Sequence, residues 1–240
     1  MLLTVAKDTE SEISMEKYEY LLSKLPPYLY DSTGAPKEWA CNQFEENNEH
    51  RHLSHLYCVW PMFETRNNEE LTSACEQAIA NRESENEASH ALIHRSLIAA
   101  RPKDRDSLSA ALLKLMNHKI HYDSLMTNHD YDRHSCYGTD FAISYLGIIN
   151  ESLVFSNNGE IEILPALPTS GFDKGEITGI RARTQAEIAN LKWDIAAGTA
   201  EVTIKSDISQ TIKVSCALAK NSAQEMTFHA GEVKTVEFKF

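Results

Sequence analysis

The sequence lacks any apolar run close to the ~20 residues that a membrane-spanning helix needs, so no membrane partner is expected. Its start, residues 1–8, also lacks the basic segment and the long apolar core of a secretory signal peptide. The chain as written is therefore expected to stay in the cytoplasm.

Cysteine is scarce and scattered. The five cysteines are odd in number, and they show no spacing typical of a zinc or redox motif. A chain of 240 residues does not need a dense disulfide framework to fold. The cysteines are interpreted as reduced, mostly buried thiols, with Cys136 a candidate neighbour of the site.

Positive charge is in deficit. Lysine and arginine number 23 against 35 acidic residues, which gives a formal net charge of −12. Nucleic acid requires a basic footprint, so a nucleic-acid partner is excluded, as are an anionic membrane surface and a phosphorylated main substrate. A neutral glycan is compatible with this charge.

Hydrophobic periodicity divides the chain into a helical part and a β part. Apolar residues at helical spacing predict helices at 12–25, 69–82, 88–100, 106–118 and 141–156, with a further apolar helical stripe from Leu53 to Trp60. The last of the five is nearly apolar all round and is expected to be buried between neighbours. From Gly159 the period becomes two, and strands are predicted at 160–164, 177–183, 186–194, 200–206, 210–218, 225–229 and 233–240.

This change of period predicts an α+β, multidomain chain. Length alone allows one large domain or two modest ones. The pattern favours two: a helical domain at 1–157 and an antiparallel β-sandwich at 158–240.

Side chains suited to ligand binding cluster in Glu38-Trp39 and in the block from His50 to Tyr57. Histidine titrates near neutral pH, the planar guanidinium of arginine presents several N–H donors in fixed directions, and tryptophan offers a flat apolar face. Together they suit the binding of a polyhydroxylated ligand such as a sugar. Two alternatives are a solvated loop and half of a metal site. A metal site would need further ligands of fixed geometry, so no metal or other cofactor is predicted.

Four segments in order carry a resemblance to a known family: 25–28 (LPPY), 38–39 (EW), 50–56 (HRHLSHL) and 159–168 (GEIEILPALP). Over roughly residues 12–240, the chain resembles glycoside hydrolase family 95. These enzymes are inverting α-L-fucosidases, with relatives that act on α-L-galactosides. The resemblance implies that the helical part is the C-terminal portion of an (α/α)6 barrel, followed by the C-terminal β domain. Family members are often exported.

The resemblance also implies roles for individual residues. His50, Arg51 and His52 match the sugar-contacting HRH segment, Glu38 and Trp39 match a substrate-side loop, and His55 is expected to brace the others. His134 has no counterpart in these motifs, but it is a further substrate-binding candidate because it lies close to Asp140 in the sequence.

The sequence does not contain both catalytic carboxylates of the family. Inversion needs a general acid and a general base on opposite sides of the sugar. The family acid lies in a Ser-Pro-Glu segment that this sequence does not contain, and the family aspartate aligns with Cys136. Asp140 is the first candidate to replace this aspartate, and Asp132 is the second. Thr139 or Asp140 could instead cap the following helix.

These observations lead to one main hypothesis and two alternatives. The chain is expected to be a C-terminal part of a family 95-like glycosidase, inactive alone and completed by the missing N-terminal half. Its expected ligand is a fucosylated oligosaccharide. The alternatives are a glycan-binding remnant and a structural or interaction protein.

Overall fold

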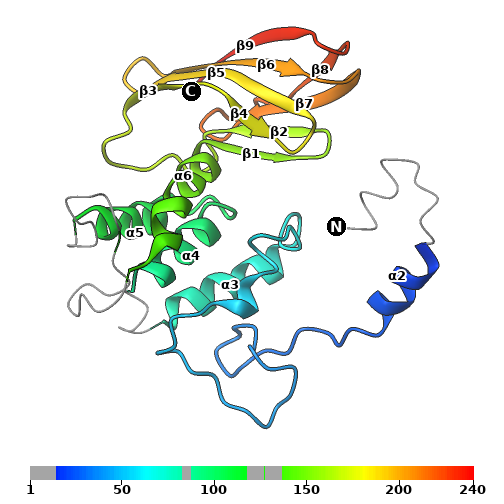
Figure 1. Cartoon of the computed structure of the whole chain (residues 1–240), viewed down its shortest axis with the longest axis vertical. Coiled ribbons are helices and arrows are strands. Elements are labelled where there is room, and N and C mark those ends of the chain that lie inside the picture. Colours follow the sequence, from blue (N-terminus) through cyan, green and yellow to red (C-terminus); the bar gives the residue numbers. More distant parts are fainter. Residues whose placement is uncertain (1–14, 83–87, 118–126, 128–136) are drawn as a thin grey trace. The chain divides into compact units, whose positions relative to one another are not determined.

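The computed structural model describes residues 15–82, 88–117, 127 and 137–240, and its elements are traced in Figure 1. The chain forms two compact units, Met1–Ser84 and Glu85–Phe240. The units are described separately below. Helices and two β-sheets occur together, which confirms the predicted α+β class.

The first unit contains helix α2 (Met15–Ser23), the short 3-10 helix η1 (Ser54–Leu56) and helix α3 (Glu69–Ala80). The Asn68 side chain caps α3 by accepting a hydrogen bond from the backbone N–H of Leu71 at 3.0 Å. The buried face of α3 consists of Leu71, Ala74, Cys75 and Ala78. The helical stripe predicted from Leu53 to Trp60 is wrong. Only η1 is helical there, and turns follow it.

The second unit begins with three helices, α4 (Ser89–Ala99), α5 (Arg105–Asn117) and α6 (Thr139–Leu153). Helix α4 packs against both α5 and α6, and most of its side chains are buried. It is therefore the central helix of this small layer.

Helix α6 differs from its prediction in two ways. It ends at Leu153 rather than at 156, because residues 154–157 form strand β1. A continuous apolar run fits either a helix or a buried strand, so periodicity could not place this boundary. The helix is also not buried all round, since Ile143 is 76% exposed and Leu146 is 68% exposed.

Nine strands follow α6, and their bounds are β1 (Val154–Asn157), β2 (Glu160–Ile163), β3 (Lys174–Ile177), β4 (Ile180–Ala182), β5 (Ala186–Asp194), β6 (Thr199–Ser206), β7 (Gln210–Cys216), β8 (Gln224–Phe228) and β9 (Val233–Lys239). One sheet has the order β1-β2-β7-β8. The other has the order β3-β5-β6-β9, with β4 also paired to β5. The pairing of β2 with β7 is parallel, so the expectation of a wholly antiparallel sandwich is corrected.

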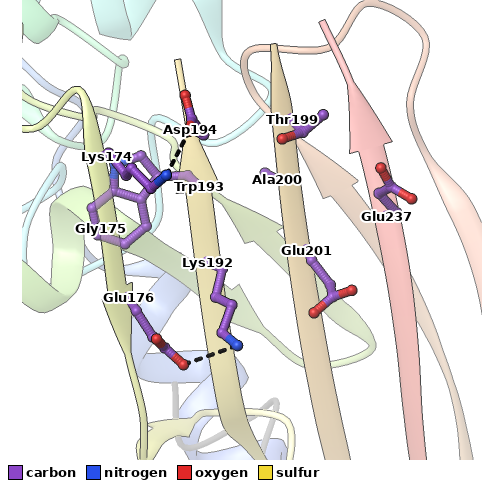
Figure 2. Close-up of a pocket in the computed structure, with 10 residues that line it drawn as sticks. All are labelled: Lys174, Gly175, Glu176, Lys192, Trp193, Asp194, Thr199, Ala200, Glu201 and Glu237. Atoms are coloured by element: carbon purple, nitrogen blue, oxygen red, sulfur yellow. Dashed lines mark ion pairs between the residues drawn. The ribbon is translucent and has the colours of Figure 1, made fainter. Parts of the chain in front are cut away.

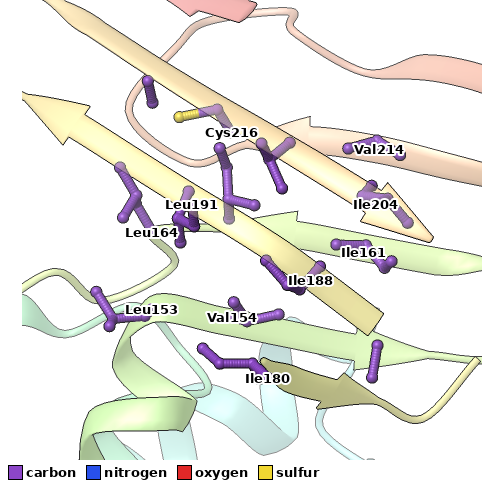
Figure 3. Close-up of a cluster of buried hydrophobic side chains, with 14 of the residues drawn as sticks. Leu153, Val154, Ile161, Leu164, Ile180, Ile188, Leu191, Ile204, Val214 and Cys216 are labelled. Carbon is purple, nitrogen blue, oxygen red and sulfur yellow. The ribbon is translucent and has the colours of Figure 1, made fainter. Parts of the chain in front are cut away.

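The two sheets share one hydrophobic core (Figure 3). Period-two alternation turns every second side chain of β5, β6 and β7 inward, as the burial of each strand shows. Leu191, Ile204 and Val214 are fully buried examples from these three strands. Strand β4, missed as a separate element, adds Ile180 to the same core.

Buried charges join the helices to the sheets within the second unit. The Glu151 carboxylate of α6 lies 3.4 Å from the Arg101 guanidinium, and both side chains are about 90% buried or more. Arg183, just after β4, donates to the same carboxylate at 2.6 Å. Glu151 therefore connects the helical layer to the five-stranded sheet.

The 159–168 segment is attached to the same layer. Lys103 donates to the Glu162 carboxylate at 2.7 Å, and Arg105 Nε donates to the Leu167 carbonyl at 2.7 Å. Ala166 is fully buried in a cluster with residues of α4 and α5. This segment thus anchors β2 and the following turn to the helices.

Among the described residues, no helix combines the length and hydrophobicity needed to cross a membrane.

Replacing Glu151 with Gln should destabilise the second unit by about 3 kcal/mol. The substitution removes the negative charge that lies 3.4 Å from the buried Arg101 guanidinium, and removing one partner is the costly way to break a buried pair. Urea denaturation measures the loss. Glu225→Gln, an exposed position on β8, is the matched control and should change stability by less than about 0.5 kcal/mol. Equal effects of the two substitutions would contradict the role given to Glu151.

A second prediction compares two glycines. A Cβ added to Gly175 would lie 2.3 Å from the Trp193 ring, beside which Gly175 lies in Figure 2. Gly175→Ala should therefore cost about 1–3 kcal/mol. Gly147 in α6 has nothing within 4 Å of an added Cβ, so Gly147→Ala should stabilise by about 0.5–1 kcal/mol through helix propensity. Thermal unfolding of the two variants should shift in opposite directions.

Candidate functional site

A cavity of about 290 Å³ lies within the first unit, where the loops on either side of the Glu38-Trp39 pair approach η1. This volume is at the lower end of the roughly 300–1,000 Å³ typical of small-molecule pockets. Its lining includes the polar and aromatic side chains of Tyr28, Lys37, Glu38, Trp39, Ser54, His55, Tyr57 and Glu64. Three of the predicted site residues, Glu38, Trp39 and His55, are thus brought together.

Glu38 is held in place from both sides. The Ser54 hydroxyl donates to its carboxylate at 2.6 Å, which joins the EW segment to the histidine block. The backbone N–H of Glu38 donates to the Glu46 carboxylate at 2.8 Å, and Lys37 lies 3.5 Å from the same carboxylate. The carboxylate of Glu38 keeps further acceptor capacity for a ligand.

Trp39 supplies an apolar surface. Its ring packs edge-on against Phe44, with 5.5 Å between ring centroids, and the residue remains 48% exposed. A half-exposed aromatic ring is suited to stacking on the C–H face of a sugar.

The HRH segment is separated from this cavity. The rings of His50 and His52 lie 4.9 Å apart, and the backbone N–H of His52 faces Nδ1 of His50 at 3.4 Å. Arg51 has a buried Nε with no hydrogen-bond partner in the part of the chain that the structure describes. None of these three residues belongs to the lining of the cavity. Their predicted contact with a sugar stays a prediction.

Arg82, just beyond the end of α3, was missed by the sequence analysis. Its guanidinium donates to the backbone carbonyls of Asn47 and His50 at 3.1 and 3.2 Å, and to Nε2 of His55 at 2.8 Å. Arg82 therefore connects the loop before the histidine block to the cavity wall. A single arginine outside any motif gives no sequence signal for such a role.

His55 is held in its neutral form. Burial is the largest cause and the positive charge of Arg82 the second, and together they lower the pKa of His55 to about 4, against the opposing effect of Glu38. A neutral imidazole can accept the Arg82 hydrogen bond at Nε2. His55 thus braces the cavity and is not a cation at neutral pH.

A second carboxylate in the lining, that of Glu64, accepts a hydrogen bond from the Tyr28 hydroxyl at 2.7 Å. Burial and this hydrogen bond raise the pKa of Tyr28, which stays protonated as the donor. Tyr28 belongs to the LPPY segment, so that segment contributes to the cavity, a role the sequence analysis did not give it.

Asp140 belongs to the second unit. It lies in the first turn of α6, where the helix dipole favours a negative charge. The N-cap of α6 is Gly138, and no side-chain hydrogen bond caps this helix. The Asp140 carboxylate instead lies 3.2 Å from Nδ1 of His90, and its side chain is 50% exposed.

Three other candidates, Asp132, His134 and Cys136, lie outside the described residues.

The prediction of no metal site assumed that no helix carries an H-x-x-x-H pair, and this premise is wrong. His90 and His94 lie four residues apart on α4, with ring centroids 4.5 Å apart. This spacing places both rings on one helix face and occurs in metal sites. A metal needs more ligands, and the described residues contain no group of three or more suitable side chains.

A larger hollow, of about 570 Å³, lies on the outer face of the five-stranded sheet (Figure 2). Two ion pairs cross it, Lys174 with Asp194 at 2.9 Å and Lys192 with Glu176 at 3.2 Å. These charges satisfy one another across β3 and β5, so the candidate site is the cavity of the first unit.

The pKa of His55 provides a direct test of the cavity wall. Its expected value of about 4 lies below the ordinary value of about 6.5, so the unfolded chain binds more protons between these two values. The stabilisation, at most about 3 kcal/mol, should be complete above pH 6.5 and lost as the pH falls to 4. NMR titration of the histidine ring protons, assigned with His55→Gln, measures the pKa.

Arg82→Gln should raise the pKa of His55 while leaving it below 6.5, because burial remains. Lys24→Gln removes a positive charge that does not contact His55 and is the matched control. An unshifted pKa near 6.5 in the unmodified chain would contradict this account.

Comparisons with known proteins agree with these features. Residues 3–153 match the model of the glycosyl hydrolase family 95 catalytic domain, and residues 155–240 match that of the glycoside hydrolase family 95 C-terminal domain. Alpha-L-fucosidase 2 of Arabidopsis thaliana is 26% identical over 183 residues, which are 71% of this chain and 21% of the relative. The chain thus spans about a fifth of the curated relative that it matches. The two family models together cover almost the whole chain, which therefore belongs to glycoside hydrolase family 95.

Proposed function

We propose that this chain is the C-terminal part of a family 95 inverting glycosidase specific for α-L-fucosides or α-L-galactosides, and that alone it binds the glycan without hydrolysing it. The observation that carries the proposal is the cavity of the first unit, which combines Glu38, Trp39 and His55. A relative named alpha-L-fucosidase 2 supports the choice of sugar.

The chemistry of the cavity suits a neutral sugar. The Glu38 carboxylate can accept hydrogen bonds from sugar hydroxyls while Ser54 holds it in place. The exposed ring of Trp39 can cover an apolar sugar face. His50, Arg51 and His52 are proposed to extend this binding site, as the family resemblance implies. His134 is proposed separately as a further substrate-binding residue.

Hydrolysis requires more than this cavity offers. An inverting enzyme needs a protonated acid and an ionised base about 6.5–9.5 Å apart. The resemblance places the acid in a Ser-Pro-Glu segment, which is absent from this sequence. Asp140 is proposed to take the place of the family's catalytic aspartate. A preceding part of the catalytic domain is proposed to supply the acid.

The helices support a partial barrel. We propose that residues 1–157 are the C-terminal part of an (α/α)6 toroid and that residues 158–240 are the β domain. The exposed apolar side chains of α6, Ile143 and Leu146, are those expected of a helix that lacks neighbours of a complete toroid. The same exposed face favours an interaction protein as the second candidate function.

Calorimetric titration with L-fucose and L-galactose tests the binding site. We expect saturable binding of at least one of these sugars, and binding about tenfold weaker or more in Glu38→Gln, because a hydrogen bond to a charged group is worth about 1.5–3 kcal/mol. Glu45→Gln changes an exposed glutamate in the same loop and should leave the affinity unchanged. D-glucose is the control sugar.

Two results would contradict the proposal. Absence of a response to both L-sugars would argue against the glycan site and favour the interaction protein. Release of L-fucose from a 2-linked fucoside by the chain alone would show that the chain is a complete catalyst.

A further inference from the structure

Two buried thiols face each other beneath the candidate cavity. Cys58 lies in the turns after η1, Cys75 lies on the buried face of α3, and the two residues are 4% and 3% exposed. Their sulfur atoms are 3.7 Å apart, within hydrogen-bond distance, so one thiol can donate to the other. The two thiols thus bring the turn after η1 into contact with α3.

The two thiols differ in their access to small molecules. Cys58 belongs to the lining of the cavity together with its neighbours Tyr28 and Glu64, whereas Cys75 does not. A small reagent that enters the cavity therefore meets Cys58 first. Cys75 stands directly behind it and is the nearest thiol for a second step.

The hydrogen bond between the sulfurs also sets the order of ionisation. The bond to Cys75 is the largest cause that lowers the pKa of Cys58, against burial and the nearby Glu64. The same bond and burial raise the pKa of Cys75. Cys58 is therefore the better nucleophile of the pair, because the thiolate is the reactive form.

We propose that Cys58 and Cys75 form a reversible redox pair in which Cys58 reacts with a peroxide and Cys75 resolves the product as a disulfide. The inference rests on the contact of the two thiols and on the access of Cys58 to the cavity, and it does not depend on the proposed function.

The reaction balances in two steps. The Cys58 thiolate attacks one oxygen of hydrogen peroxide, the O–O bond breaks, and a sulfenic acid and hydroxide form. The Cys75 sulfur then attacks the Cys58 sulfur. The S–O bond breaks, the S–S bond forms, and the oxygen leaves as water with the proton of Cys75. Overall, two thiols lose two electrons and two protons to the peroxide, which becomes two molecules of water. An added dithiol reverses the reaction by thiol–disulfide exchange.

The bond would require a small movement. The sulfur atoms must approach from 3.7 Å to about 2.05 Å. The product would join the turn after η1 to α3 across a short stretch of chain, so local opening of the cavity wall should become rarer.

The experiment uses the full chain. We expect one equivalent of hydrogen peroxide to yield a Cys58–Cys75 cross-linked peptide in a non-reducing digest analysed by mass spectrometry, with two fewer alkylatable thiols and full reversal by dithiothreitol. Hydrogen exchange of the peptides that contain residues 55–62 should slow in the oxidised form.

Variants separate the two roles. In Cys75→Ser, the sulfenic acid of Cys58 should persist and be trapped by dimedone, whereas Cys58→Ser should leave Cys75 reduced. Cys216→Ser is the matched control, since Cys216 is a buried thiol of the β domain whose pKa is raised by burial, and it should leave the cross-link unchanged.

The wild-type chain decides the outcome even if a variant fails to fold. Circular dichroism establishes that the oxidised chain remains folded. The proposal is overturned if both thiols are still alkylated after oxidation of the folded chain, or if the cross-link joins either of them to another cysteine.

Discussion

The buried carboxylate of Glu151 is the constraint on which the arrangement of the second unit depends. It pairs with the buried guanidinium of Arg101, and it also accepts a hydrogen bond from Arg183, which follows strand β4 of the five-stranded sheet. The 159–168 segment adds contacts of its own to α4 and α5. The 159–168 segment, one of the motifs that carry the family resemblance, therefore also joins the helices to the sheets.

The first unit is stabilised differently. Its cavity is built from loops that polar side chains hold together. Arg82 and Lys37 donate to backbone carbonyls, and Ser54 donates to the Glu38 carboxylate. The β domain instead relies on apolar side chains that alternate along its strands (Figure 3). The candidate cavity is therefore expected to respond to charge and protonation, whereas the interior of the sheets should respond chiefly to changes of packing.

Several features followed from the sequence because their signal is local. Alternation located β5 to within its exact bounds, and the EW and HRHLSHL segments led to Glu38, Trp39 and His55, which share one cavity. Strand β1 was missed because an apolar run has no period that tells a buried strand from a helix end. The parallel pairing of β2 with β7 was missed because register and direction depend on partners distant in the sequence. Arg82 and the Cys58–Cys75 contact were missed for the same reason.

The parallel pairing of β2 with β7 has a consequence for the order in which the protein is made. The β1–β2 hairpin emerges directly after α6, but its inner edge is completed by residues synthesised about fifty positions later. Until β7 has left the ribosome, β2 exposes the unpaired backbone groups of one edge. Chains truncated between β2 and β7 are therefore expected to aggregate through this open edge.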